Sequence, residues 1–102
     1  PSSDGFARSS TNITLGERTV IDRYGNLSGS YAGTPGSSIS ARGMAPGSEN
    51  MPYTVLRVIK EITVPGGPAA GVSAFNADGG AMQFFFKGGI EKYIGEFLEV
   101  VH

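Results

Sequence analysis

Runs of apolar and β-branched residues, interrupted by turn residues, divide the chain into short strand-like segments. The longest run covers residues 53–64, lies between Pro52 and Pro65, and predicts a central strand. The Pro-Gly-Gly-Pro sequence at residues 65–68 predicts a turn directly after it. Further strands are predicted over residues 15–25, 30–32, 38–40, 70–75, 82–86 and 97–101.

Helical spacing of apolar residues appears near the end of the sequence. Ile90, Tyr93 and Ile94 stand at i, i+3 and i+4, which predicts one or two helical turns. Residues 25–50 hold closely spaced glycines and two prolines, a density that breaks helices and shortens strands. Residues 1–14 are expected to form a poorly ordered, linker-like lead-in.

These segments predict an α+β fold, with a small, strongly bent antiparallel β-sheet in two halves and one or two short helices. The 102 residues fit a single domain over 1–102. A net charge of −1 gives no chain-wide attraction for nucleic acid or an anionic membrane, so neither is expected as a partner. No apolar run approaches the roughly 20 residues that span a bilayer.

The residue types that the chain lacks exclude several chemistries. There is no cysteine, which excludes disulfides, thiolate metal sites and cysteine nucleophiles. His102 is the only histidine and occupies the last position, which argues against Ser-His triads and histidine zinc sites. Glu49, Glu61 and Asp78 do not have metal-ligand spacing, so no metal is expected.

A lone glutamine follows a Gly-Gly pair and begins a run of aromatic residues. The glycines at residues 79–80 predict a turn at which the backbone can approach a ligand closely. In the strand that follows, Gln83 and Phe85 share one face and Met82, Phe84 and Phe86 share the other, and we expect Gln83 at a ligand-accessible edge. The alternative interpretation is an ordinary loop leading into a core strand.

Four short blocks follow one another in an order that is similar to a known family. They are an Arg-Tyr-Gly motif with a second tyrosine further on, an arginine followed by a proline, a strand-like block, and the Gly-Gly block with its glutamine. They occupy residues 22–31, 42–46, 52–58 and 75–83. Over about residues 15–101 the chain resembles the tuberculosis necrotizing toxin family, whose members hydrolyse NAD on an ADP-ribosyltransferase-like fold.

The resemblance implies a role for each matching residue. Gln83 stands at the family's catalytic position. Arg23 and Arg42 stand where the family grips the NAD diphosphate and orders the site, and Arg23 is counted with the catalytic residues. Tyr24 and Tyr31 stand where aromatic residues line the nicotinamide and ribose pocket, and some members carry histidine near Tyr53. Substrate-binding roles are implied for Arg42, Tyr24, Tyr31, Tyr53 and Phe75.

These residue types suit cleavage of the bond between nicotinamide and ribose. Nicotinamide leaves as a neutral base from a cationic ring, so little acid catalysis is needed and a carboxylate pair is not required. An arginine fork can bind the diphosphate, an amide can orient a ribose hydroxyl or water, and a tyrosine face can stack on the pyridinium. Glutamine in place of a glutamate favours water as the acceptor.

Each candidate also has a structural interpretation. Arg23 can pair with Asp22 or Glu17 at a strand surface, and Tyr24 and Tyr31 can form half-buried edges of the core. An arginine such as the one at position 42, alone in a Gly/Pro-rich loop, has few structural duties.

The resemblance therefore implies an NAD glycohydrolase with NAD as substrate and no cofactor. It further implies the C-terminal effector domain of a larger secreted protein, delivered into a target cell to act in its cytoplasm. A cognate immunity protein that blocks the cleft is the expected partner. The alternatives are an ADP-ribosyltransferase toxin on the same fold and a non-enzymatic, Gly-rich β adhesion module.

Overall fold

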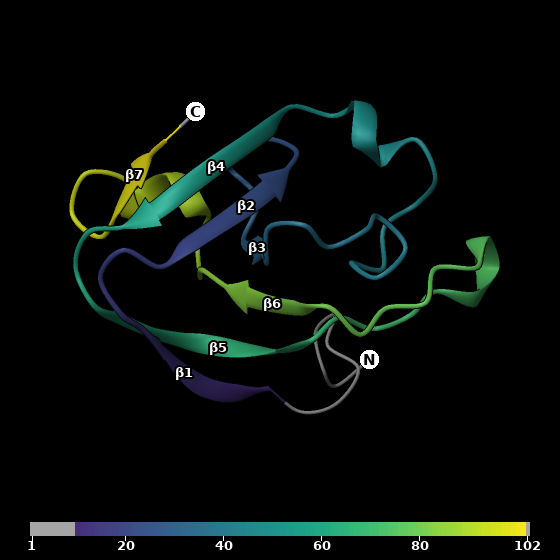
Figure 1. The fold of residues 1–102 in the computed structure, drawn as a ribbon, viewed down its shortest axis with the longest axis horizontal. Coiled ribbons are helices and arrows are strands. Elements are labelled where there is room, and N and C mark those ends of the chain that lie inside the picture. Colours follow the sequence, from purple (N-terminus) through teal and green to yellow (C-terminus); the bar gives the residue numbers. More distant parts are fainter. Residues whose placement is uncertain (1–9, 102) are drawn as a thin grey trace.

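The computed structural model describes residues 10–101, apart from the side chain of Phe75. Its strands form one antiparallel sheet in the order β1-β5-β6-β3-β2-β4-β7 (Figure 1). The predicted small antiparallel sheet is therefore confirmed. The strands are β1 (Thr11–Leu15), β2 (Val20–Tyr24), β3 (Tyr31–Gly33), β4 (Tyr53–Val58), β5 (Ile62–Pro68), β6 (Met82–Phe85) and β7 (Leu98–Val100).

The predicted α part of the fold is replaced, within residues 10–101, by short 3-10 helices. The helix expected at residues 90–94 is one such segment, enclosed by Gly89 and Gly95 with φ angles of 110° and 103°. A positive φ stops a helix, because it turns the backbone out of the helical path. The 3-10 helices are η1 (Ser48–Asn50), η2 (Ser73–Phe75) and η3 (Ile90–Tyr93).

The long strand predicted over residues 53–64 is two strands, β4 and β5. The chain turns between them, where the N–H groups of Ile59 and Lys60 donate to the carbonyl of Phe97 at 2.8 and 3.4 Å. This tertiary contact ends a β-favouring run that contains no turn residue of its own. The strand predicted over residues 15–25 is likewise divided by a turn, between β1 and β2.

The turn predicted at residues 65–68 is the end of β5. Gly66 pairs with Thr11 of β1 on one side and with Phe84 of β6 on the other. A Cβ built on Gly66 would lie 2.6 Å from Cδ1 of Ile13. Gly66 is therefore packed closely between two strands and is not part of a turn.

The predicted lead-in over residues 1–14 overlaps the sheet. Ile13 of β1 packs against the core, and the hydroxyls of Thr14 and Thr63 are hydrogen-bonded at 2.9 Å. Residues 1–9 of the predicted lead-in lie outside the described residues.

The short strands predicted over residues 38–40 and 70–75 are not formed. The first segment is a series of turns, and η2 occupies the end of the second. Both lie in Gly-rich loops, whose backbone groups bond to each other across the loops and not to a strand.

The sheet has two halves that meet at β3. Figure 1 shows β1, β5 and β6 along one side of the molecule and β2, β4 and β7 along the other. The register between β2 and β3 is limited to the pair Asp22↔Gly33. This pair is consequently the backbone joint between the halves.

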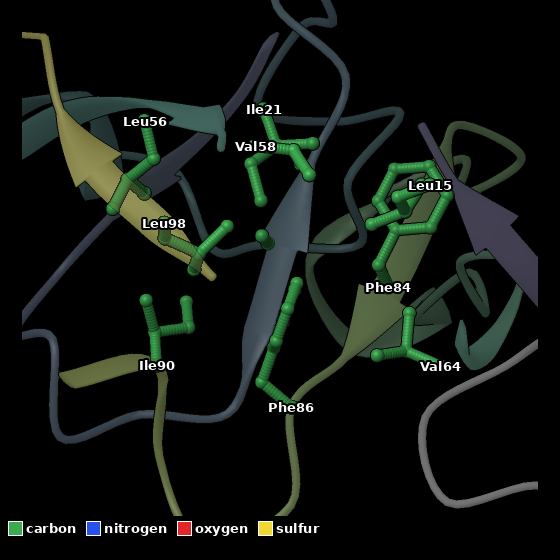
Figure 2. Packing of buried hydrophobic residues seen from close by; sticks show 10 residues of the cluster. Leu15, Ile21, Leu56, Val58, Val64, Phe84, Phe86, Ile90 and Leu98 are labelled. Carbon is green, nitrogen blue, oxygen red and sulfur yellow. The ribbon is translucent and has the colours of Figure 1, made fainter. Parts of the chain in front are cut away.

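One hydrophobic core cluster spans both halves of the sheet (Figure 2). Leu15, Val64 and Phe84 come to it from β1, β5 and β6. The side chains from β2, β4, β7 and η3 are Ile21, Leu56, Val58, Ile90 and Leu98, and Ala32 and Phe86 belong to the same cluster.

Candidate active site

A pocket of about 310 Å³ lies where the two halves of the sheet meet. Its walls come from β2, β3 and β6 and from the loops that hold residues 42–44 and 70–72. The pocket brings together most of the side chains that the sequence singled out. Of the predicted site residues, its lining includes Arg23, Tyr24, Tyr31, Arg42 and Gln83.

A buried carboxylate that sequence reasoning missed lies in this wall. Asp22 is 0% exposed, while its neighbour Ile21 enters the core on the opposite face of β2. Three donors satisfy the Asp22 carboxylate. Arg42 donates from Nη1 to Oδ1 at 2.7 Å and from Nη2 to Oδ2 at 2.8 Å, and the hydroxyl of Tyr53 donates to Oδ2 at 2.7 Å.

The guanidinium of Arg42 is hydrogen-bonded within the protein through all but one of its N–H groups. Besides its fork on Asp22, it donates from Nε to the carbonyl of Ser37 at 3.0 Å and from Nη2 to the carbonyl of Thr34 at 3.2 Å. These bonds use four of the five guanidinium N–H donors. The expectation that Arg42 has few structural duties is therefore wrong, because it fastens its own loop to β2.

Arg23 has a different environment. It donates from Nε to the carbonyl of Asn26 at 2.7 Å and from Nη1 to the carbonyl of Tyr31 at 2.8 Å. Within residues 10–101, no ion pair joins it to a carboxylate, so the suggested pairing with Asp22 or Glu17 is wrong. Partial burial lowers the pKa of Arg23, yet arginine remains charged at neutral pH.

Two tyrosine rings pack against each other at a tilt of 41° beside the buried ion pair. The rings of Tyr24 and Tyr53 lie 4.6 Å apart between centroids, and the guanidinium of Arg42 lies over the Tyr24 ring at 4.9 Å. The hydrogen bond to Asp22 and burial raise the pKa of Tyr53 to about 12, although the residue is 43% exposed. Tyr53 thus supports the wall of the pocket without being part of its lining.

Phe75 belongs to η2, in the loop between β5 and β6. Its side chain lies outside the described residues, so its predicted substrate-binding role stays a prediction.

Gln83 lies inside the sheet and not at an edge. It pairs with Gly33 of β3 and Gly67 of β5. The alternation expected over residues 82–86 is confirmed for Phe84 and Phe86, which are buried in the core, while Gln83 lines the pocket. It is wrong for Met82, which is 38% exposed and lines the same pocket as Gln83. An interior strand holds the amide more firmly than an edge would, because both neighbouring strands fix its backbone.

The Gly-Gly turn before Gln83 serves packing within the protein. Gly79 and Gly80 have φ angles of 72° and 94°, and a Cβ on Gly79 would lie 2.5 Å from the nitrogen of Gly71. The carbonyl of Ser40 accepts from the N–H of Gly79 at 2.9 Å, and that of Ala41 accepts from the N–H of Ala81 at 3.0 Å. The Arg42 loop and the start of β6 are therefore joined by backbone bonds.

Within residues 10–101 the structure offers neither a metal site nor a membrane-spanning helix. No group of three metal-ligating side chains occurs in this part of the chain. No helix in the same part is long and apolar enough to cross a membrane.

The chain is similar to a known family and to two solved structures. The family model described as tuberculosis necrotizing toxin matches residues 14–100. Two solved structures share the fold at 19% sequence identity. "Rhs1-CT in complex with cognate immunity protein RhsI1" has a TM-score of 0.66 and covers 93% of this chain and 79% of its own. "Structure of Tse6 in complex with Tsi6" has a TM-score of 0.69 and covers 99% of this chain and 79% of its own.

A search of curated proteins found no match. The family match covers far more than half of the chain and includes every block on which the resemblance was based. The chain therefore belongs to the tuberculosis necrotizing toxin family and is a toxin domain of that family.

Proposed function

We propose that this domain hydrolyses NAD to nicotinamide and ADP-ribose, on a sheet of the ADP-ribosyltransferase-like type. The observation that carries the proposal is one pocket lined by two tyrosines, a glutamine held between two strands, and an arginine that has no carboxylate partner among residues 10–101. These groups match the diphosphate, the pyridinium ring and the attacking water of the reaction.

The charges of the pocket favour an anionic ligand. Asp22 neutralises Arg42, so among the lining residues Arg23 remains as the cation without a counter-charge within residues 10–101. A half-buried guanidinium attracts a phosphate oxygen more strongly than an exposed one, because water screens it less. Arg23 is the principal diphosphate ligand in this proposal, and Arg42 adds its remaining N–H donor.

The chemistry requires little from the protein beyond positioning. Water attacks C1′ of the ribose, the bond to nicotinamide breaks with its electron pair leaving on nicotinamide, and the water proton passes to solvent. Gln83, held between two strands, orients that water or a ribose hydroxyl. Tyr24 and Tyr31 line the part of the pocket where the nicotinamide and its ribose would lie.

The pocket volume of about 310 Å³ is at the lower end of the ~300–1,000 Å³ range of small-molecule sites. It suits the nicotinamide riboside half and the diphosphate, with the adenosine half extending outward.

The delivery and control of the domain are proposed from its relatives. A structure of Rhs1-CT contains its cognate immunity protein, and we propose a comparable inhibitor for this domain. We further propose that the domain is the C-terminal effector of a larger secreted protein and acts in the cytoplasm of a target cell. An unrestrained NAD hydrolase would deplete the NAD of its producer, which is the reason to expect an inhibitor.

The purified domain incubated with fluorescent etheno-NAD tests the enzymatic proposal. We expect a fluorescence increase that is lost in Gln83→Ala and retained in Gly16→Ala, whose Cβ would meet nothing within 4 Å. No signal from the wild type would contradict the proposal and favour the adhesion module.

A further inference from the structure

The Asp22 side chain lies at the joint between the two halves of the sheet. Asp22 pairs with Gly33 across β2 and β3, and its carboxylate is 0% exposed. A Cβ built on Gly33 would lie 2.7 Å from Nη1 of Arg42 and 3.4 Å from Oδ1 of Asp22. The absence of a side chain at position 33 leaves the space in which the two charged groups meet.

The contact between Asp22 and Arg42 is a buried, bidentate ion pair. The side chain of Arg42 is 7% exposed, and both carboxylate oxygens accept from it. Such a pair adds little net stability compared with an apolar pair, because both charges lose their hydration. It does impose one geometry, since a planar fork and a carboxylate fit together in few ways.

Hydrogen bonds connect Asp22, through Arg42 and its loop, to β6, the strand that carries Gln83. Arg42 holds the carbonyls of Thr34 and Ser37, so the whole turn after β3 is fastened to β2 through Asp22. The same loop binds the N–H groups of Gly79 and Ala81 just before β6. A continuous set of bonds therefore links Asp22 to the strand that carries the candidate catalytic glutamine.

We infer that Asp22 is a positioning residue of this site. It holds Arg42 in place in the pocket wall and neutralises its charge, so that Arg23 is the arginine that binds the substrate phosphate. The inference rests on the proposed NAD hydrolysis for its kinetic consequences. Its structural part, the fastening of the loop over residues 34–44, does not depend on any activity.

Asp22→Asn is the principal test. The amide keeps the shape of the side chain but removes the charge and one acceptor oxygen. We expect KM for NAD and Kd for ADP-ribose to rise about tenfold, with kcat within about threefold, because a misplaced wall weakens binding in ground and transition states alike. The tyrosinate transition of Tyr53 should also move to lower pH, since its hydrogen bond to the anion is lost.

Gly33→Ala perturbs the same contact without removing either charge. The added methyl pushes Nη1 of Arg42 away from Asp22, and we expect a similar rise in KM. The effect of the double variant Asp22→Asn/Gly33→Ala should equal that of one single variant, because both changes break one contact. Gly16→Ala is the matched control and should leave KM unchanged.

Hydrogen exchange separates the two proposals. In Asp22→Asn, amides of residues 34–44 should exchange faster while those of β1 and β5 stay as in the wild type. If the wild type does not turn over NAD, the proposed function is wrong and exchange alone decides the role of Asp22. Unchanged exchange in that loop, or an unchanged KM in both variants of an active enzyme, would overturn the inference.

Discussion

The two arginines that line the pocket differ in their partners. Arg42 is held by an anion and two carbonyls, and four of its donors are occupied. Arg23 is held by carbonyls alone and keeps its charge without a counter-ion within residues 10–101. The difference shows that the partners of an arginine, and not its presence, decide between scaffold and ligand-binding roles.

The two arginines also differ in what holds their backbone. Arg23 projects from β2, which is paired with β4 over five residues on its other side. Arg42 belongs to a loop without strand pairing and depends on side-chain bonds for its position. Because strand pairing already holds the backbone at Arg23, its side chain is not needed to fix the chain there. The loop that carries Arg42 has no such pairing, so the Arg42 side chain fixes its position.

Removing the carboxylate should have the largest effect on stability. Asp22→Ala leaves Arg42 buried without its counter-ion, and we expect a loss of about 3–5 kcal/mol in the free energy of unfolding. Arg23→Gln should cost less than Asp22→Ala, because only hydrogen bonds to carbonyls are lost and no charge is left buried without its counter-ion. Urea unfolding of both variants measures this, and equal losses would erase the distinction between the two arginines.

Removing the amide should have the largest effect on catalysis that leaves the fold intact. Gln83→Ala should raise the barrier by about 2.7–4 kcal/mol, the cost of losing one positioned hydrogen-bonding group. Steady-state kinetics with NAD measures it, with thermal unfolding as the check on folding. Asn12→Ala, an exposed change on β1, is the control, and full activity in Gln83→Ala would exclude a catalytic role.

Ligand affinity separates the arginines directly. Arg23→Gln should weaken ADP-ribose binding by about 1.5–3 kcal/mol, the worth of a hydrogen bond between charged groups. Gly29→Ala should act in the same direction, since its Cβ would overlap the Arg23 guanidinium. Calorimetry with ADP-ribose tests this, and nicotinamide, which carries no diphosphate, is the control ligand. Unchanged ADP-ribose affinity in both variants would exclude Arg23 as a diphosphate ligand.

The pH dependence of the Tyr53 contact gives a smaller effect. Its pKa is raised to about 12 from an ordinary value of about 10, so the hydrogen bond to Asp22 stabilises the fold fully below pH 10. That contribution is lost as the pH rises from about 10 to about 12. The difference in unfolding free energy between wild type and Tyr53→Phe should therefore shrink across this range, and a constant difference would contradict the assignment.

The exposed ion pair at the far side of the sheet should have the smallest effect. Arg57 and Glu99 have side chains that are 47% and 42% exposed. Arg57→Gln is expected to change the free energy of unfolding by no more than about 0.5 kcal/mol, and less at high salt. If Arg57→Gln lost as much unfolding free energy as Asp22→Ala in the same urea experiment, burial of the Asp22–Arg42 pair would not explain the effect of Asp22→Ala.

Local sequence was sufficient to predict parts of this molecule and not others. The alternation that puts Gln83 opposite Phe84 is a property of one strand and was predicted correctly. The division of residues 53–64 depends on the Phe97 carbonyl, far away in sequence, and was missed. The turn predicted at Gly66 was wrong for the same reason, because pairing with β1 and β6, strands distant in sequence, makes this glycine part of β5.

The site shows the same limit. Arg23 and Arg42 were both found from short motifs, yet their different partners could not be read from those motifs. Asp22 was considered only as a surface partner of Arg23, because a carboxylate is normally exposed unless paired. Its actual partner is in a loop 20 positions away, and only the fold brings the two together.

Product stoichiometry tests the central claim most directly. The wild-type domain is incubated with NAD and excess protein and nucleic acid, and nicotinamide, free ADP-ribose and ADP-ribosylated macromolecules are quantified by mass spectrometry. Because an uncharged glutamine can orient water but cannot accept a proton from an attacking side chain, we expect free ADP-ribose and nicotinamide in near one-to-one ratio. Nicotinamide release matched by ADP-ribose attached to a macromolecule would contradict hydrolysis and identify a transferase.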